Sequence, residues 1–219
     1  MKTLIVGLGF GQLYKKIYES MGAEIITVDA DQSKNPDFVE ITTAIEAHPQ
    51  FDTAHICTPN RTHFALAKKL SGHSKIVFIE KPGVQNVAQW TALTHDKKTK
   101  YVMTKNNQYR DNIGEMANLG HKMSNIELNW KNNNRIPSPG SWFTNKHLAF
   151  GGVSRDLLPH MLSLLIVLSP TDYALYNVID KKVEQRYRLE DCTDTDYGKV
   201  KEDGIYDVDD NVYLKLVGP

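Results

Sequence analysis

The fold of this chain is decided near its beginning, by the sequence KTLIVGLGFG at residues 2–11. The apolar run through Val6 predicts a short buried strand, and the glycines that follow it predict a tight turn into a helix. A second apolar run, at residues 24–28, ends at Asp29. The order of strand, glycine turn, helix, strand and acid predicts a dinucleotide-binding site.

Each part of this pattern has a physical role. Glycines let the backbone turn tightly and approach a pyrophosphate, and the following helix points its positive end at the phosphates. Asp29 can accept hydrogen bonds from a ribose diol and repels a 2′-phosphate, which favours NAD over NADP. Because Gln12 occupies the third glycine position, we expect the helix to lie slightly farther from the strand. The alternative is a strand-to-helix turn with no ligand.

Composition narrows the functional class. The 219 residues can form one large domain or two small ones, and 41% hydrophobic with 24% charged residues is typical of a soluble globular protein. A formal net charge of zero gives no general attraction to nucleic acid or to anionic membranes. Cys57 and Cys192 have no metal-binding spacing, so we expect a reduced, cytoplasmic setting. Met1 and Lys2 lead directly into a strand, which predicts no signal peptide.

Strands and helices alternate over residues 1–106. Strands are expected at 2–6, 24–28, 53–57, 75–79 and 101–104, with a shorter one at 38–41. Helices are expected through Met21, with Leu13 and Ile17 at helical spacing, and at 42–47, 64–70 and 87–97. This order predicts an α/β Rossmann domain with a doubly wound parallel sheet at residues 1–106.

The pattern changes beyond residue 106. A helix is expected at 113–119, a strand at 124–131, a long loop at 132–146 and an apolar helix within 151–168, too short to span a bilayer. Further strands are expected at 174–179, 183–189 and 212–217. We therefore predict a smaller α+β domain at residues 107–219, with an open and mainly antiparallel sheet.

Two polar tripeptides follow predicted strands of the first domain: Thr58-Pro59-Asn60 and Glu80-Lys81-Pro82. Ligands bind beyond the carboxyl ends of parallel strands, so both tripeptides are expected on the same rim as the glycine turn. Lys81, made rigid by the following proline, can polarise a substrate oxygen there. The alternative is an ordinary surface lysine.

Asp156 and His160 are four residues apart, which on a helix puts both on one face. A carboxylate that orients an imidazole makes a candidate general base near neutral pH, although an ion pair on an apolar helix has the same spacing. Gly151 and Gly152 just before them let the backbone approach a ligand closely. His63 can line the crevice or stabilise the start of its helix. The sequence has no cluster of His, Cys and acidic residues with metal-ligand spacing, so we expect no catalytic metal.

Together these motifs resemble the Gfo/Idh/MocA oxidoreductases, the group of glucose–fructose oxidoreductase and inositol dehydrogenase. The resemblance covers residues 2–168, and more loosely 208–218. It consists of four elements in order: the glycine turn, the Thr58-Pro59-Asn60 tripeptide with His63, the Glu80-Lys81-Pro82 tripeptide, and Gly151-Gly152 with Asp156 and His160.

The resemblance implies an NAD-dependent oxidoreductase that moves a hydride between the nicotinamide and a hydroxyl or carbonyl carbon of a sugar, sugar derivative or cyclitol. Lys81 would hydrogen-bond the substrate oxygen, His160 would take the hydroxyl proton, and Asp156 would position both. The residues implied at the coenzyme are Gly7, Gly9, Phe10, Gly11, Gln12, Asp29, Thr58, Pro59, Asn60, His63, Glu80, Lys81 and Trp142.

Compared with typical members, the second domain is expected to be shortened, and a second copy of the chain is expected to cover its sheet edge. A non-catalytic dinucleotide-binding sensor or regulator of the same fold is the alternative function. A lyase or epimerase that uses NAD transiently is a third. The presence of Lys81, Asp156 and His160 together favours the enzyme, because a sensor does not need a proton relay.

Overall fold

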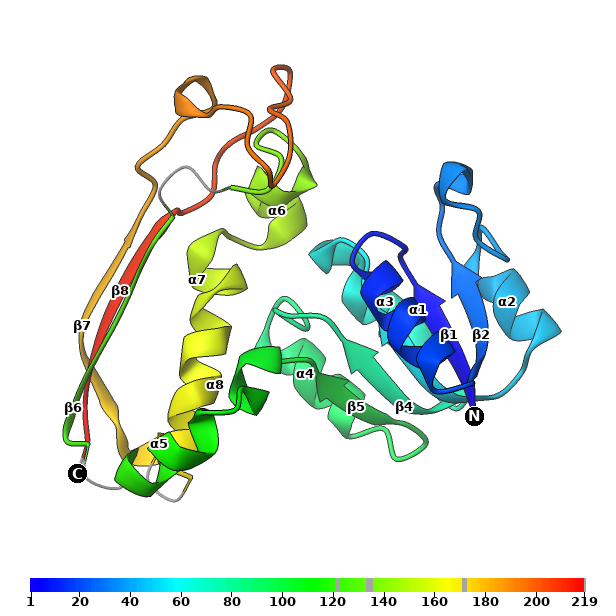
Figure 1. Cartoon of the computed structure of the whole chain (residues 1–219), viewed down its shortest axis with the longest axis horizontal. Coiled ribbons are helices and arrows are strands. Elements are labelled where there is room, and N and C mark those ends of the chain that lie inside the picture. The colour runs from blue at the N-terminus through cyan, green and yellow to red at the C-terminus, as the bar shows by residue number, and fades with distance from the viewer. Residues whose placement is uncertain (121–122, 133–135, 171–172, 219) are drawn as a thin grey trace. The chain divides into compact units, whose positions relative to one another are not determined.

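The computed structural model of the chain describes residues 1–120, 123–132, 136–170 and 173–218. The chain divides into two compact units, Met1–Thr104 and Lys105–Pro219. Part of the expected 132–146 loop, residues 133–135, lies outside the described residues. Figure 1 shows the elements of each unit.

Unit 1 is built on a five-stranded parallel sheet in the order β2-β1-β3-β4-β5. The expected α/β Rossmann fold is confirmed. Val6 pairs with both Val28 and Ile56, and Ile56 pairs with Ile79, so these four strands end at one edge. The strands are β1 (Lys2–Val6), β2 (Glu24–Val28), β3 (Phe51–Ile56), β4 (Ser74–Ile79) and β5 (Lys100–Met103).

The helices of unit 1 pack an apolar core against this sheet, as the near-continuous apolar strands require. They are α1 (Gly11–Ser20), α2 (Ile41–Ala47), α3 (His63–Lys69) and α4 (Val87–Thr94), with 3₁₀ turns η1 (Gln32–Lys34) and η2 (Asn60–Thr62). The expected strand at 38–41 is wrong: Phe38 makes a single bridge to Val28, and α2 already begins at Ile41.

Helix α1 does not use its most regular apolar stripe for the core. Leu13, Ile17 and Met21 have the helical spacing noted in the sequence, yet they are 50%, 45% and 62% exposed. The buried side of the helix is formed by Gly11 and Tyr18. The apolar spacing therefore predicted the helix correctly, but it did not predict which face of the helix packs against the sheet.

Unit 2 contains a three-stranded antiparallel sheet in the order β6-β8-β7, which confirms the second sheet type. Its strands are β6 (Asn125–Lys131), β7 (Asn177–Glu184) and β8 (Asn211–Val217). Leu214 and Leu216 of β8 are buried against Leu165 of α8 (Leu158–Leu168), with Ile126 and Leu128 packed beside them. The alternation along β8 gives one apolar face and one polar face.

Two expected strands, at 174–179 and 183–189, are one strand in the structure. β7 spans the gap between them and has a register shift between Val178 and Asp180. The remaining elements of unit 2 are α5 (Ile113–Gly120), which packs against α8, and the 3₁₀ turns η3 (Asn106–Tyr109), η4 (Trp142–Thr144), η5 (Tyr173–Leu175) and η6 (Leu189–Asp191).

The expected helix within 151–168 is interrupted. The segment Lys146–Leu168 contains an 18-residue window with a mean hydropathy of 1.2, so by length and composition alone it meets the criteria for a membrane-crossing helix. The chain breaks it into α6 (Lys146–Ala149), α7 (Val153–Asp156) and α8. Phe150 and Gly151 have φ values of 69° and 146°, which end α6, and Pro159 lies in the first turn of α8. Asp156 and His160 therefore belong to consecutive short helices.

A buried histidine lies within the sheet of unit 1. The His55 ring on β3 stacks on Phe78 at 4.7 Å between centroids, and its Nε2 is 2.8 Å from the Tyr18 hydroxyl. Its Nδ1 is buried without a hydrogen-bond partner among the described residues. Burial lowers the pKa of His55 to about 4. The neutral ring is thus the form that fits the core.

We predict that this histidine makes unit 1 sensitive to acid. The neutral form is favoured in the fold, so its stabilisation is complete above the ordinary pKa of 6.5 and is lost as the pH falls towards about 4. The loss is on the order of 3 kcal/mol. Urea unfolding should show the stability difference between wild type and the non-titrating His55→Gln shrinking over that range. A constant difference would contradict the prediction.

Candidate functional site

The glycine turn after β1 is held in a conformation that only glycine adopts easily. Gly7 has φ 94°, and its N–H donates to the Val28 carbonyl at 2.8 Å. A Cβ at this position would lie 2.7 Å from the Cys57 carbonyl oxygen. The turn therefore requires glycine for its backbone angles and for its close approach to the end of β3.

The other two glycines differ in their surroundings. A Cβ at Gly9 would meet nothing within 4 Å, so the backbone there is open to a ligand. A Cβ at Gly11 would lie 2.8 Å from Ile5 Cγ2, so Gly11 is the point where α1 meets the sheet closely. Gln12 is half-buried, and the helix displacement expected from it stays a prediction. The N-cap residue of α1, Phe10, makes no side-chain capping hydrogen bond.

Asp29, at the end of β2, is tied to the same turn. Its Oδ2 accepts from the Leu8 N–H at 2.6 Å and from Lys34 Nζ at 2.9 Å, and its Oδ1 accepts from the Asp31 N–H at 2.9 Å. Burial acts to raise the pKa of Asp29, but the Asp31 and Leu8 amides and Lys34 outweigh it and hold that pKa below its usual value. The carboxylate is therefore ionised beside the glycine turn.

The turn after β4 is anchored through Glu80. Its Oε1 accepts from the Tyr14 hydroxyl of α1 at 2.5 Å and from the Thr104 hydroxyl at 2.7 Å. Burial, followed by the hydrogen bond and the charge of Glu80, raises the pKa of the Tyr14 phenol. The Gly83 N–H closes the turn by donating to the Glu80 carbonyl at 2.8 Å. Lys81, half-buried, lies inside this closed turn.

The turn after β3 holds the Thr58-Pro59-Asn60 tripeptide, whose Asn60 is buried. The His63 side chain at the start of α3 is fully buried, and its two ring nitrogens lie within 2.9 Å of the Thr58 and Gly83 carbonyl oxygens. These three turns and Asp29 all follow strands that end at the same edge of the sheet. The edge includes the point between β1 and β3 where the strand order reverses, which is where parallel sheets bind ligands.

In unit 2 the start of α7 is held by Asp209. Its Oδ1 accepts from the Gly152 N–H at 3.1 Å and from the Ser154 hydroxyl at 2.9 Å, and its Oδ2 accepts from the Ser154 N–H at 2.6 Å. A Cβ at Gly152 would lie 1.7 Å from the Asp209 carbonyl oxygen. Glycine at position 152 is thus needed to bring α7, which carries Asp156, against the segment that leads into β8.

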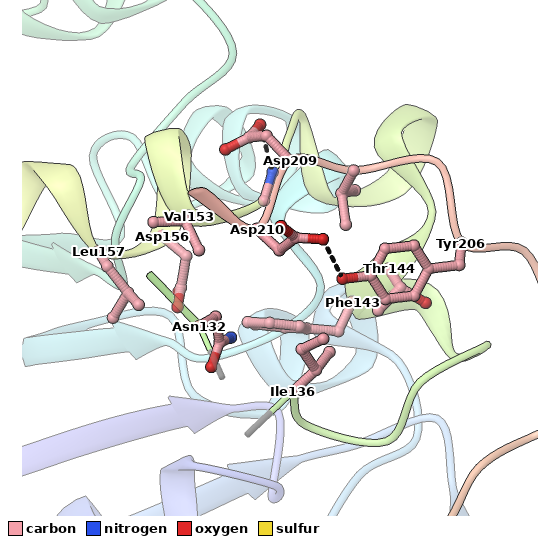
Figure 2. Close-up of a pocket in the computed structure, with 12 residues that line it drawn as sticks. Asn132, Ile136, Phe143, Thr144, Val153, Asp156, Leu157, Tyr206, Asp209 and Asp210 are labelled. Carbon is pink, nitrogen blue, oxygen red and sulfur yellow. Dashed lines mark hydrogen bonds between the residues drawn. The ribbon is translucent and has the colours of Figure 1, made fainter. Parts of the chain in front are cut away.

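A small pocket lies beside this helix (Figure 2). Asp156 and Asn132 supply carboxylate and amide groups to its wall, and Phe143 supplies an aromatic face. Next to them, Asp210 accepts from the Tyr206 hydroxyl at 3.1 Å. Burial and the Asp210 charge raise the pKa of Tyr206. The remaining lining residues are Ile136, Thr144, Gly152, Val153, Leu157, Val208 and Asp209.

The expected site residues divide between the two units. Unit 1 holds the three turns, with Asp29 and Lys81 among them. Unit 2 holds Asp156, His160 and Trp142. Trp142 lies in η4, is 37% exposed and contacts the Phe143 ring edge-on, with 5.5 Å between centroids.

The match to a known protein family lies almost entirely in the Rossmann unit. Residues 1–107 match the Gfo/Idh/MocA model, described as "Oxidoreductase family, NAD-binding Rossmann fold". Over these 107 of its 219 residues, the chain is similar to the Gfo/Idh/MocA family. Unit 1 fits NAD physically as well, because Gly9 leaves the turn open, α1 has no side-chain cap, and Asp29 is ionised.

Individual relatives extend the likeness into unit 2. The chain is 28% identical over 185 residues to a protein of Amycolatopsis mediterranei (strain S699) named "Putative UDP-kanosamine synthase oxidoreductase subunit", covering 77% of this chain but 51% of that protein. GenD2 from gentamicin A biosynthesis, solved with NAD, has a TM-score of 0.71 at 17% identity, covering 100% of this chain and 70% of that structure. Levoglucosan dehydrogenase, solved with NADH and levoglucosan, has a TM-score of 0.70 at 18% identity, with 97% and 62% covered. The chain thus spans about half the length of the curated relative.

Four residues that hold these turns and helices were not expected from the sequence: Tyr14, Lys34, Thr104 and Asp209. Tyr14 and Thr104 act on Glu80 from positions 66 and 24 residues away in the chain. Lys34 lies only five residues after Asp29, so the sequence could have suggested this ion pair. Asp209 follows a buried valine in a segment that the sequence related only loosely to the family.

We predict that Asp29 and Lys34 together set the coenzyme preference. Asp29→Ala removes the repulsion of a 2′-phosphate and releases Lys34 to pair with it, so the NADPH/NADH affinity ratio should rise by about tenfold. The double variant Asp29→Ala/Lys34→Gln should lose that gain, and Lys34→Gln alone is the matched control. Fluorescence titration measures both affinities. An unchanged ratio in Asp29→Ala would show that Asp29 does not read the ribose.

Proposed function

We propose that the chain is an NAD-dependent oxidoreductase that acts on a hydroxyl or carbonyl carbon of a sugar, sugar derivative or cyclitol. One observation carries the proposal: Lys81 lies in a turn held by Glu80 on the same sheet edge as the glycine turn and Asp29. That edge supplies the parts of a dinucleotide site and a cationic side chain together.

The substrate class has separate support. One relative's name refers to a UDP-linked aminosugar synthase, and one structural neighbour was solved with levoglucosan. The walls of the small pocket in unit 2 carry Asp156 and Asn132, whose side-chain oxygens are of the type that accepts hydrogen bonds from hydroxyl groups. Phe143 adds an apolar face for the C–H side of a sugar ring.

In the oxidation direction, bound NAD supplies the hydride acceptor. Lys81 donates a hydrogen bond to the substrate oxygen and stabilises the negative charge that grows there. His160 accepts the hydroxyl proton as the C–H bond breaks, and Asp156 orients substrate and imidazole. The products are the carbonyl compound, reduced coenzyme and protonated His160, and the reduction direction reverses each transfer.

We predict that Lys81→Ala and His160→Ala each lower turnover by about 10²–10⁴-fold, the usual value of one acid–base group. NADH affinity should change little, because neither side chain is the anchor of the phosphates or the ribose. Lys75→Ala and His95→Ala, at exposed positions, are the matched controls.

The assay is NADH formation with a panel of sugars, sugar nucleotides and cyclitols. Wild-type rates in both variants would contradict the proton relay. NADH binding without net NADH formation on any substrate would favour the sensor or the transient-NAD lyase instead.

We further propose that copies of the chain associate through the sheet of unit 2. β7 is an edge strand in the described sheet, and its Val178 and Ile179 are 56% and 57% exposed. Exposed apolar edge strands favour pairing with another chain. Size-exclusion chromatography with light scattering should give an oligomer that Ile179→Lys shifts towards monomer. A monomeric wild type would contradict this.

A further inference from the structure

The His63 imidazole has an unusual environment. It is fully buried, with Nδ1 2.9 Å from the Gly83 carbonyl oxygen and Nε2 2.8 Å from the Thr58 carbonyl oxygen. A backbone carbonyl only accepts hydrogen bonds, whereas a neutral imidazole has one N–H and one lone pair. Only one of the two carbonyls therefore receives a proton from the neutral ring.

The two contacts are not equivalent. The contact with Gly83 is buried, while the contact with Thr58 is partly open. A buried carbonyl left without a donor costs about 1–3 kcal/mol, and a partly open one can turn to water instead. The single N–H of the neutral ring therefore belongs on Nδ1, where it donates to Gly83.

The Gly83 carbonyl is the exit of the turn that holds Lys81. The entry of that turn is fixed by Tyr14 and Thr104 on the Glu80 carboxylate, and the Gly83 N–H bonds back to the Glu80 carbonyl. His63 thus holds the exit of the turn at the Gly83 carbonyl. His63 is the first residue of α3, so its contact with Gly83 connects the turn after β4 to the helix that follows the Thr58 turn.

We infer that His63 is a positioning residue that fixes Lys81 through an Nδ1–H hydrogen bond to Gly83, and that it does not contact the coenzyme itself. The inference uses the proposed function only for the role of Lys81. Burial, the largest influence, lowers the pKa of His63, and the two carbonyls and the charge of Glu80 oppose it. The neutral ring with one N–H is consistent with that direction.

Two amide substitutions separate the two hydrogen bonds. The amide nitrogen of His63→Asn reaches the place of Nδ1 and keeps a donor for Gly83, whereas that of His63→Gln reaches the place of Nε2 and keeps a donor for Thr58. The readout is the rate of Lys81 acetylation relative to that of Lys75, followed by mass spectrometry in the whole chain without coenzyme. Lys75 is a suitable internal reference because its side chain is 75% exposed.

We expect His63→Asn to keep the Lys81/Lys75 ratio within twofold of wild type and His63→Gln to change it several-fold, with similar circular dichroism for both. Equal changes in the two variants, or none in either, would overturn the inference. If either variant does not fold, ¹⁵N NMR of the wild-type histidine rings decides: protonated Nδ1 with unprotonated Nε2 supports the inference, and the opposite tautomer overturns it. A failed proposed function would appear as missing NADH formation and would leave these results unchanged.

Discussion

The backbone at Gly7 is the constraint on which the rest of unit 1 depends. Its left-handed angle turns the chain out of β1 while its N–H still bonds to Val28, and the absence of a Cβ lets it lie against the Cys57 carbonyl. β1 can therefore pair with a strand on each side while the chain leaves its end and enters α1. Without this turn, Gly9 would not be open and Gly11 would not meet Ile5.

Hydrogen bonds between turns then convert this edge into one connected structure. Leu8 bonds to Asp29, Tyr14 bonds to Glu80, and the His63 ring lies between Thr58 and Gly83, so no turn is held by its own residues alone. Hydrogen bonds to charged groups are each worth about 1.5–3 kcal/mol. A rim of this kind is preorganised, which saves a ligand the entropy of ordering it.

The sequence predicted the elements whose signals are local. Strand runs, glycines and the acid after β2 lie within 30 residues, so the Rossmann unit and its turns could be recognised before the structure. Features that depend on distant partners could not. The exposed stripe of Leu13, Ile17 and Met21 has perfect helical spacing, yet the sheet meets the side that carries Tyr18. In unit 2, the apolar helix expected within 151–168 is divided at Leu157 into α7 and α8.

Both units contain the same kind of contact, which the spacing of residues in the sequence does not predict. In each, a carboxylate at a strand end accepts backbone N–H groups from a different segment: Asp29 from Leu8, and Asp209 from Gly152. Asp210 does the same for the segment leaving β7, through Arg186. The partners in unit 2 are 57 and 24 residues apart, so only folding brings them together. In this chain, therefore, an aspartate beside a strand holds the backbone of another segment in place, and its loss is expected to displace the turn or helix that it holds.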